Sequence, residues 1–477
     1  MEKKLPKNWI EVPLIDVLEV LENGSRPKGG VQGIFEGVPS LGGEHLNSDG
    51  GFKFGKLKFV PTSFAEKMNR GRIKENDILI VKDGATTGKT SFVKDNFPYD
   101  LAFVNEHVFI CRAFPNLNSK SIFYFLFGKT GFDRIMENFT GSAQGGINQK
   151  FASNTIIPLP PATEQNRIAT KLDTLFAQLE GIKMSMTAIP VLLKNFRQQV
   201  LTQAVSGKLT EEWRKGKDKE LEEWKVNKIG EIVTSIQSGK SFLCPETPVS
   251  KGQVGLVKIS AVTWEVFDQT KTKTVTDINK IVPEYFIKKG DFLMSRANTL
   301  ELVGASVIVD KIEYDIMLSD KVWRVNFEND NDKIFMNYFL KSKQGRLEIE
   351  SKATGNQESM RNLSQSNFKD IDIKLPSKNE QEEIVNRIKS LFAKADAIEE
   401  KYKNLKAKID TLPQAILHKA FKGELTEQLD SDGDAKELLK QIQELKNIGV
   451  KPKKATAKKV KNYSEEDGVL GMVAEAK

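Results

Sequence analysis

The feature that most constrains the fold is a repeat of the sequence within itself. Leu159-Pro-Pro-Ala-Thr-Glu-Gln-Asn-Arg-Ile168 recurs 216 residues later as Leu375-Pro-Ser-Lys-Asn-Glu-Gln-Glu-Glu-Ile384. At the same offset and without a gap, Gly207-Lys-Leu-Thr-Glu211 recurs as Gly423-Glu-Leu-Thr-Glu427. Self-similarity at a fixed offset is the signature of a duplicated structural unit. The chain is therefore expected to fold as two related halves.

The segments that precede the two copies of this motif also match, but more loosely. Trp9 pairs with Trp224 and Gly24 with Gly239, and Asn76–Ile80 pairs with 290–294. Each half therefore has a divergent first part and a similar second part. The predicted boundaries are 1–158 and 212–374 for the divergent domains, 159–211 and 375–427 for the similar regions, and 428–477 for a basic, disordered tail.

The similar regions carry apolar residues at steps that alternate between three and four. These residues are Ile168, Leu172, Leu175, Leu179 and Ile182 in the first copy, and Ile384, Ile388, Leu391, Ala395, Ile398, Tyr402 and Leu405 in the second. So narrow an apolar stripe is what two supercoiled helices bury. Because one chain contains two such stripes, we expect the two helices to pair with each other as an antiparallel coiled coil. Pro190 and Pro413 are expected to kink or restart their helices.

The divergent parts have the pattern of mixed α/β domains. Short apolar runs bounded by Gly, Asn or Pro predict strands, at 56–60, 77–81 and 105–111 in the first half and at 255–260, 291–294 and 321–325 in the second. Helical spacing follows at 119–138 and 332–350. The predicted fold class is α+β: two mixed α/β domains joined by two long antiparallel helices, related by a pseudo-two-fold internal duplication.

Composition narrows the possible partners and chemistry. The 477 residues exceed what one compact core holds, and no apolar run approaches the roughly 20 residues of a membrane helix. Two cysteines and three histidines, with no close pair of histidines, argue against a disulfide framework or a zinc cluster. The net charge of +8 and the pI of about 9.0 favour a polyanionic partner.

One stretch suggests a different class of protein. Lys82-Asp-Gly-Ala-Thr-Thr-Gly-Lys-Thr90 follows an apolar strand and resembles a nucleotide-binding loop. That signature requires four residues between its first Gly and the Gly-Lys-Thr, and here only three separate Gly84 from Gly88. A second strand, not a helix, is expected to follow. The second copy retains a base, Arg296, but has no Gly-Lys-Thr. A hairpin with a basic tip is the better interpretation, and a P-loop-like NTPase remains the least favoured alternative.

Two loops in each half carry side chains suited to DNA. Phosphates are contacted by Lys, Arg and Thr, adenine is read by Asn or Gln, and guanine is read by Arg. The candidates are Lys82, Thr86, Thr87, Lys89, Gln144, Asn148, Gln149 and Lys150 in the first half, and Arg296, Asn298, Asn356, Gln357, Arg361 and Asn362 in the second. For any single side chain, an ordinary polar surface loop is an equally good interpretation.

The order of the parts resembles a known family. A variable domain, a Pro-x-x-Glu-Gln-x-x-Ile helix, a second variable domain and the same helix resemble the specificity subunit of type I restriction–modification enzymes. The motifs are Pro160 to Ile168 with Gln198 to Leu209, and Glu380 to Ile384 with Gln414 to Leu425. The second copy departs from the double proline by having Ser377.

The resemblance implies a function for each part. Each variable domain would be a target recognition domain that reads one half of a bipartite, asymmetric DNA sequence. The helices would set the spacer and dock two methyltransferase subunits, and restriction subunits would join them. The complex would be a DNA adenine methyltransferase and a site-specific, ATP-dependent endonuclease. S-adenosylmethionine, ATP and magnesium would belong to those partners, with no cofactor and no catalytic or metal site in this chain.

The residues themselves agree with this interpretation, because they show no methyltransferase motif and no nucleotide-binding motif. The expected location is the prokaryotic cytoplasm, on nucleoid DNA and not in a membrane. A structural coiled-coil adaptor that does not bind specific DNA is the main alternative.

Overall fold

The computed structural model describes residues 5–141, 145–220, 224–357 and 360–449. The chain forms two units, one of residues 1–180 with 409–477 and the other of residues 181–408. We refer to them as unit 1 and unit 2. Both long helical regions are divided between the units, so each unit contains the end of one region beside the beginning of the other.

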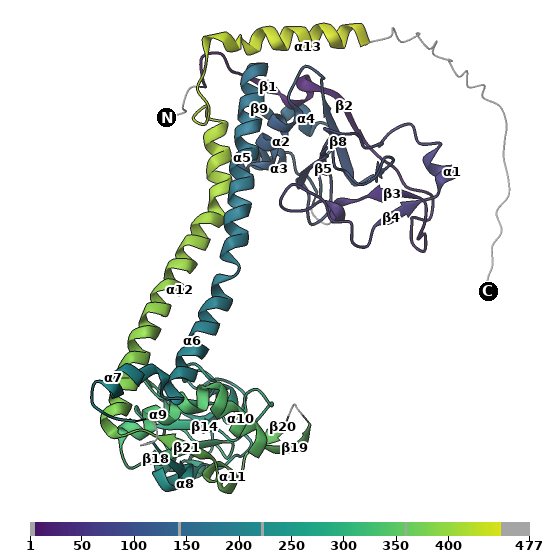
Figure 1. The fold of residues 1–477 in the computed structure, drawn as a ribbon. Coiled ribbons are helices and arrows are strands. Elements are labelled where there is room, and N and C mark those ends of the chain that lie inside the picture. Colours follow the sequence, from purple (N-terminus) through teal and green to yellow (C-terminus); the bar gives the residue numbers. More distant parts are fainter. Residues whose placement is uncertain (1–4, 142–144, 221–223, 358–359, 450–477) are drawn as a thin grey trace, which may run out of the picture. The chain divides into compact units, whose positions relative to one another are not determined.

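Unit 1 is built around a four-stranded antiparallel sheet (Figure 1). Its order is β2 (Leu18–Asn23), β8 (Val108–Ala113), β5 (Ile78–Val81) and β6 (Thr90–Phe92). A smaller sheet has the order β4 (Lys58–Val60), β3 (Val38–Leu41) and β7 (Phe103–Val104), and β1 (Ile10–Pro13) pairs with β9 (Ile156–Leu159). Short helical turns lie between these strands: η1 (Leu14–Val17), η2 (Gly43–His45), α1 (Thr62–Ala65) and α4 (Phe151–Asn154).

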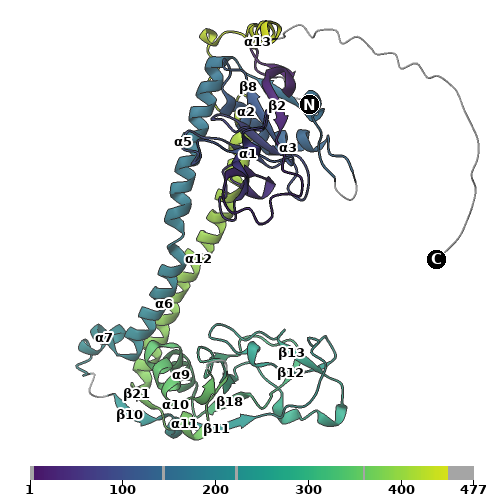
Figure 2. The same ribbon diagram turned by 90° about the vertical axis from the view of Figure 1, so that its right-hand side faces the viewer.

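Unit 2 repeats this topology (Figure 2). Its four-stranded sheet has the order β11 (Val233–Ser238), β18 (Val322–Phe327), β14 (Phe292–Ser295) and β16 (Ser306–Ile308). The smaller sheet is β13 (Thr272–Val275), β12 (Val254–Val257) and β17 (Asp315–Met317), and β10 (Lys225–Lys228) pairs with β21 (Asp372–Leu375). A further sheet has the order β15 (Ala297–Asn298), β20 (Met360–Asn362) and β19 (Thr354–Gln357). The remaining short helices are α8 (Ile229–Ile232), η5 (Ile259–Ala261), η6 (Ile278–Lys280), η7 (Pro283–Tyr285) and α11 (Gln365–Lys369).

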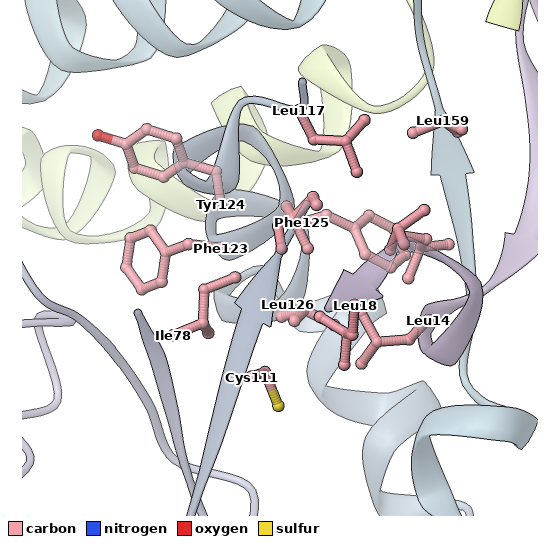
Figure 3. Close-up of a cluster of buried hydrophobic side chains, with 14 of the residues drawn as sticks. Leu14, Leu18, Ile78, Cys111, Leu117, Phe123, Tyr124, Phe125, Leu126 and Leu159 are labelled. Carbon is pink, nitrogen blue, oxygen red and sulfur yellow. The ribbon is translucent and has the colours of Figure 1, made fainter. Parts of the chain in front are cut away.

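A helical hairpin covers one face of each four-stranded sheet. In unit 1 it is α2 (Ser119–Phe127) and α3 (Lys129–Met136), and in unit 2 it is α9 (Asp330–Lys341) and α10 (Lys343–Lys352). The sequence predicts one continuous helix in each place. The helices break instead at Gly128 and Ser342, and Ser342 accepts a hydrogen bond from the amide of Gly345 as an N-cap. Figure 3 shows Phe123, Phe125 and Leu126 of α2 packed toward Leu18 and Ile78 of the sheet.

The long helices are α5 (Ala162–Met186), α6 (Ile189–Val205) and α12 (Lys378–Ala420). Pro190 stands in the first turn of α6, where a proline needs no amide partner, so the predicted restart is confirmed there. Pro413 lies inside α12, and the helix does not stop at it. Within unit 1, Ile168 and Leu172 of α5 share a core with Leu417 and Ala420 at the far end of α12.

Unit 2 pairs the opposite ends of the same regions, since Val200 and Ala204 of α6 pack with Ile384 and Ile388 at the start of α12. The first residues of one helix thus meet the last residues of the other in each unit. This is the predicted antiparallel arrangement, and the α+β fold class is confirmed.

The predicted stripe is only half right. Both rows are buried only near the helix starts, where Ile168 and Ile384 are 0% exposed. Further along the helices of unit 2, one residue per heptad is buried: Met186, Leu193 and Val200 in the first helical region, and Ile388 and Ala395 in the second. The neighbouring heptad position is not, and Ile182, Ile398 and Leu405 are 46%, 50% and 49% exposed. In unit 1, Leu172 and Leu179 are buried while Leu175 is half-buried. The two helices contact each other along a line narrower than the apolar stripe, so its second row faces outward.

The repeated Glu-Gln pair explains why the motif recurs. Glu380 is 2% exposed and accepts hydrogen bonds from Trp224 Nε1 (2.9 Å), Thr210 Oγ1 (2.7 Å) and Arg214 Nη1 (2.5 Å). Those partners precede β10 or follow α6, in η3 (Lys208–Thr210) and α7 (Glu211–Lys215). Gln381 Nε2 donates to the carbonyl of Pro376 (3.2 Å). The pair therefore ties the start of α12 to the domain that precedes it.

Unit 1 has the same connection, with Trp9 and Thr426 in the places of Trp224 and Thr210, and with Gln428 as the third donor where unit 2 has Arg214. Glu164 is 1% exposed and accepts from Trp9 Nε1 (2.7 Å), Thr426 Oγ1 (3.1 Å) and Gln428 Nε2 (2.9 Å). Gln165 Nε2 donates to the carbonyl of Pro160 (2.8 Å). Here the residues that follow the second helical region close on the first domain.

The prediction that the chain is disordered from residue 428 is wrong for 428–449. η8 (Asp430–Asp432) and α13 (Ala435–Gly449) are ordered elements of unit 1. The unit 1 core includes three buried residues of this segment at helical spacing: Ala435, Leu438 and Ile442. The charged segment is therefore an amphipathic helix. Residues 450–477 of the predicted tail lie outside the described residues.

Asp432 anchors this C-terminal segment. Arg167 Nη1 and Nη2 donate to its two carboxylate oxygens (2.5 and 2.6 Å), and Thr163 Oγ1 donates to Oδ1 (3.0 Å). The hydrogen bonds from Arg167, followed by those from the Leu429 amide and Thr163, hold the pKa of Asp432 at about 2, below its usual range. A lowered folded-state pKa means that this contribution to stability is present above about pH 4 and is lost as the pH falls toward 2.

Asp432→Asn is therefore expected to loosen the segment at neutral pH, because it removes the charge that Arg167 grips. Hydrogen exchange of the α13 amides should speed up in the variant. Acidification of the wild type from pH 4 to pH 2 should likewise lower the protection of these amides, measured as the exchange rate relative to the intrinsic rate at each pH. Asp430→Asn, which removes an exposed carboxylate two residues away, is the matched control and should leave α13 protected. Unchanged α13 exchange in Asp432→Asn would show that the carboxylate does not anchor the helix.

In the part of the chain that the structure describes, no helix is long and apolar enough to cross a membrane.

Candidate DNA-reading loops

The two loops singled out from the sequence meet in unit 1. The first loop, residues 82–89, joins β5 to β6, and the second loop, residues 140–150, leads into α4. The amide of Ile147 donates to the carbonyl of Lys82 (2.8 Å), and the amide of Lys82 donates to the carbonyl of His107 (2.8 Å). Three segments far apart in sequence are thus joined at one end of the sheet.

Unit 2 joins its loops in the same way. The amide of Leu363 donates to the carbonyl of Arg296 (2.8 Å), and the amide of Arg296 donates to the carbonyl of Lys321 (3.0 Å). Here the first loop spans 296–304 and the second spans 354–364. The first loop of unit 1 closes with a bond from the Gly88 amide to the Val81 carbonyl, and that of unit 2 closes from Gly304 to Ser295, each 2.8 Å long.

The first loop of unit 1 is a hairpin turn and not a phosphate-binding loop. Strand β6 begins at Thr90, where a nucleotide-binding loop would start a helix, and it pairs antiparallel with β5. The Lys89 ammonium, which would reach the phosphates, instead donates to the carbonyl of Leu46 (3.3 Å). The structure therefore excludes the P-loop alternative and confirms the hairpin.

The side chains of this loop differ in how accessible they are. Thr87 is buried, and its hydroxyl donates to the carbonyl of Gly84 (2.7 Å), so Thr87 and the half-buried Lys89 shape the loop. Thr86 is exposed, and the side chain of Lys82 is 31% exposed beside Asp83 at 3.6 Å. Lys82 and Thr86 are the two members of the predicted set that this loop presents to solvent.

The second loop of unit 1 presents Asn148, Gln149 and Lys150 to solvent. Asn148 Oδ1 accepts from the amide of Lys150 (2.9 Å), which fixes the approach to α4 and leaves the Gln149 and Lys150 side chains at the surface. Gln144 lies outside the described residues.

In unit 2, predicted residues lie on two paired strands: Ala297 and Asn298 of β15 pair with Asn362 and Arg361 of β20. Arg296 Nε donates to the carbonyl of Asp320 (2.7 Å), and Arg361 Nη1 donates to that of Gly355 (2.7 Å).

The other members of the unit 2 set are placed less uniformly. Asn298 Oδ1 accepts from the amide of Thr299 (2.9 Å), and Asn362 is half-buried. Gln357 is exposed on β19. The backbone of Asn356 belongs to the same strand, while its side chain lies outside the described residues.

Sequence reasoning missed a group of charged residues beside the unit 1 loops. His107 Nδ1 lies 2.5 Å from Asp83 Oδ1 and its Nε2 lies 3.3 Å from Glu106 Oε1. Arg26 Nε lies 2.6 Å from the same Glu106 oxygen. These four residues come from three segments, so no local pattern marks them. At the offset of 214 residues that pairs 76–80 with 290–294, His107 falls opposite Lys321.

Comparison with known proteins shows the family. Residues 6–186 and 221–407 match the family described as type I restriction modification DNA specificity domain. The EcoKI specificity subunit of Escherichia coli strain K12 is 29% identical over 432 residues, which is 89% of this chain and 91% of the relative. The StySPI specificity subunit of Salmonella potsdam is 27% identical over 89% of this chain and 91% of the relative.

A solved structure shares the fold. The HsdS subunit from Thermoanaerobacter tengcongensis superposes with a TM-score of 0.60 at 17% identity, covering 89% of this chain and 99% of that one. This chain belongs to the type I restriction–modification DNA specificity family. It is the DNA specificity subunit of a type I restriction–modification system, a part of the type I complex that is not itself the catalyst. Such subunits typically carry no cofactor.

Proposed function

We propose that each unit reads one half of a bipartite, asymmetric DNA target through its pair of loops. The observation that carries the proposal is the joining of first and second loops by equivalent backbone bonds in both units, Ile147 to Lys82 and Leu363 to Arg296. Two domains that bind different DNA sequences in the same manner require the same loop backbone and different side chains on it. An adaptor without DNA specificity has no need of it.

The chemistry of the presented side chains supports the same proposal. Lys82 and Lys150 in unit 1 and Arg296 and Arg361 in unit 2 can bind phosphates or guanine, and Gln149 can bind adenine. The overall charge of +8 favours attraction to DNA.

The salt dependence of DNA binding tests the first loop directly. Lys82→Gln should lower the slope of log affinity against log salt by about 0.9, the value for one lost phosphate contact. Lys89→Gln should leave the slope unchanged, because its ammonium is turned toward the Leu46 carbonyl. Arg296→Gln should act like Lys82→Gln, through the other half-site.

The measurement is a gel-shift titration of the complex with its methyltransferase subunits at several salt concentrations. Lys171→Gln on α5 is the charge-matched control, since this exposed lysine lies outside both loops. A Lys82→Gln titration that overlays the wild type at every salt concentration would remove the loop from the DNA interface.

We also propose that two methyltransferase subunits dock on the helices. The outward row of the apolar stripe supports this: in unit 2, Ile182, Ile398, Leu405 and Phe196 are 46%, 50%, 49% and 39% exposed. Ile398 and Leu405 lie seven residues apart on one face of α12, and an exposed apolar patch is typical of a protein contact. S-adenosylmethionine would then be bound by those subunits, and ATP and magnesium by restriction subunits that join them. The complex would act on double-stranded DNA in the prokaryotic cytoplasm, at the nucleoid.

A further inference from the structure

Four backbone positions near the first and second loops are equivalent in the two units but carry different side chains. Beyond the bonds that join the loops, the amide of Gly24 donates to the carbonyl of Asn105 (3.1 Å), and that of Gly239 donates to Ser319 (3.2 Å). A Cβ on Gly24 would lie 1.5 Å from the carbonyl oxygen of Val104. Only glycine therefore allows this approach of β2 to the segment before β8.

The same constraint holds in unit 2. A Cβ on Gly239 would lie 1.8 Å from the carbonyl oxygen of Leu318. Glycine thus fixes the equivalent approach in both units, and the residues beside it can be matched one to one. Arg26 stands opposite Ser241, two positions after the glycine, and Glu106 stands opposite Asp320.

The remaining two positions follow from the bonds that join the loops. His107 and Lys321 provide the carbonyls that Lys82 and Arg296 bind, so they are equivalent. Asp83 and Ala297 are the next residues along the two first loops. We call Arg26, Asp83, Glu106 and His107 the variable quartet of unit 1.

The quartet of unit 1 offers hydrogen-bond acceptors. Its two carboxylates flank His107, and their side chains are 28% and 26% exposed for Asp83 and Glu106. Among the described residues, Glu106 Oε2 is buried and has no hydrogen-bond partner, although Oε1 is bound by Arg26. The partly exposed side chains of Asp83 and Glu106 are the acceptors that this cluster can offer to a base amino group.

The matching end of unit 2 offers donors instead. Ala297 replaces one carboxylate, and Asp320 accepts from the Ser241 hydroxyl. Lys321 is exposed. Arg296 directly precedes β15, and Arg361 lies on β20, the strand that pairs with β15. Lysine and arginine donate to the two acceptors of guanine, whereas carboxylates accept from the amino group of cytosine.

We infer that the variable quartet is where the two units read different bases. Unit 1 reads a base amino group, that of cytosine or adenine, with Glu106 and Asp83. Unit 2 reads guanine with Lys321, the counterpart of His107, together with Arg296, which occupies the position of Lys82 beside the quartet. The inference rests on the proposed function, because it requires that each unit reads its own half-site through this end of its sheet.

The test is to map methylated adenines in DNA modified by the complex of this chain with its methyltransferase subunits. Glu106→Gln keeps the size of the side chain but places an amide where an acceptor stood. The ratio of the methylation rate on DNA with the preferred base pair to the rate on DNA with another base pair there should fall at least about fivefold, at one position of one half-site. The other half-site and the spacer should be unchanged. Asp95→Asn, an exposed carboxylate of unit 1 outside the quartet, is the control and should change nothing.

A second variant carries the unit 2 side chains at the four quartet positions and at Lys82: Arg26→Ser, Lys82→Arg, Asp83→Ala, Glu106→Asp and His107→Lys. It should shift the preference in the same half-site toward guanine. If this variant is inactive, the relative methylation rates of the Glu106→Gln complex alone test the inference. An unchanged target with unchanged relative rates for Glu106→Gln would overturn the inference and leave the proposed function intact. A wild-type complex that methylates no bipartite target would instead overturn the proposed function.

Discussion

Glu380→Ala is expected to destabilise unit 2 by about 3–5 kcal/mol, the usual cost of leaving one member of a buried ion pair without its partner. Arg214 and Glu380 are 5% and 3% exposed at their side chains, and their atoms approach to 2.5 Å. Removing the carboxylate also leaves Trp224 Nε1 and Thr210 Oγ1 without their acceptor. A single truncation therefore affects three contacts at the junction between α12 and its domain.

Urea unfolding of the chain, followed by tryptophan fluorescence, measures this effect, because four of the five tryptophans lie in unit 2: Trp213, Trp224, Trp264 and Trp323. Glu400→Ala, on the exposed face of the same helix, is the matched control and should shift stability by less than about 0.5 kcal/mol. Glu164→Ala should be milder than Glu380→Ala, because Trp9, Thr426 and Gln428 are neutral partners. Equal losses for Glu164→Ala and Glu380→Ala would show that the buried Arg214 charge adds nothing to the cost.

Inserting seven residues after Glu180 and another seven after Lys408 is expected to lengthen the spacer between the half-sites by about three base pairs. Both insertions fall where the chain passes between the units, so each unit keeps its internal contacts. Seven residues preserve the heptad phase of the buried positions, and a helix rises 1.5 Å per residue, which extends the helices by roughly 10 Å. One base pair occupies about 3.4 Å.

Methylation mapping measures the spacer directly. Both half-sites should remain as in the wild type while their separation grows. Insertion of two residues at the same places is the contrast, since it rotates the buried row away from its partner and should destabilise the protein. If the seven-residue variant is soluble and methylates the original spacing, the helices do not set the separation.

The duplication and the helices could be predicted because their signals are long and periodic. The runs at 77–81 and 291–294 gave the central strands of both sheets to within a residue or two of β5 and β14. The width of the helix contact could not be predicted, because a pattern shows which residues share a face but not how many rows the partner covers. Ile398 and Leu405 were therefore expected to be buried and are half exposed.

Two other features escaped prediction for physical reasons. In 428–477 the charge concealed the amphipathic spacing of Ala435, Leu438 and Ile442, which becomes meaningful only beside the core of unit 1. The variable quartet combines segments near residues 26, 83 and 106, and only long-range strand pairing brings them together. The loops themselves were found from the sequence, since their polar residues are contiguous.

If each unit reads its own half of a bipartite target, one unit can be exchanged without affecting the other half-site. The experiment replaces residues 1–158 with the corresponding domain of the EcoKI specificity subunit and maps methylated adenines in a host that carries the complex. We expect one half-site to change while the other half-site and the spacer stay as in the wild type. A change in both half-sites, or in neither, from a complex that still methylates DNA would contradict this expectation.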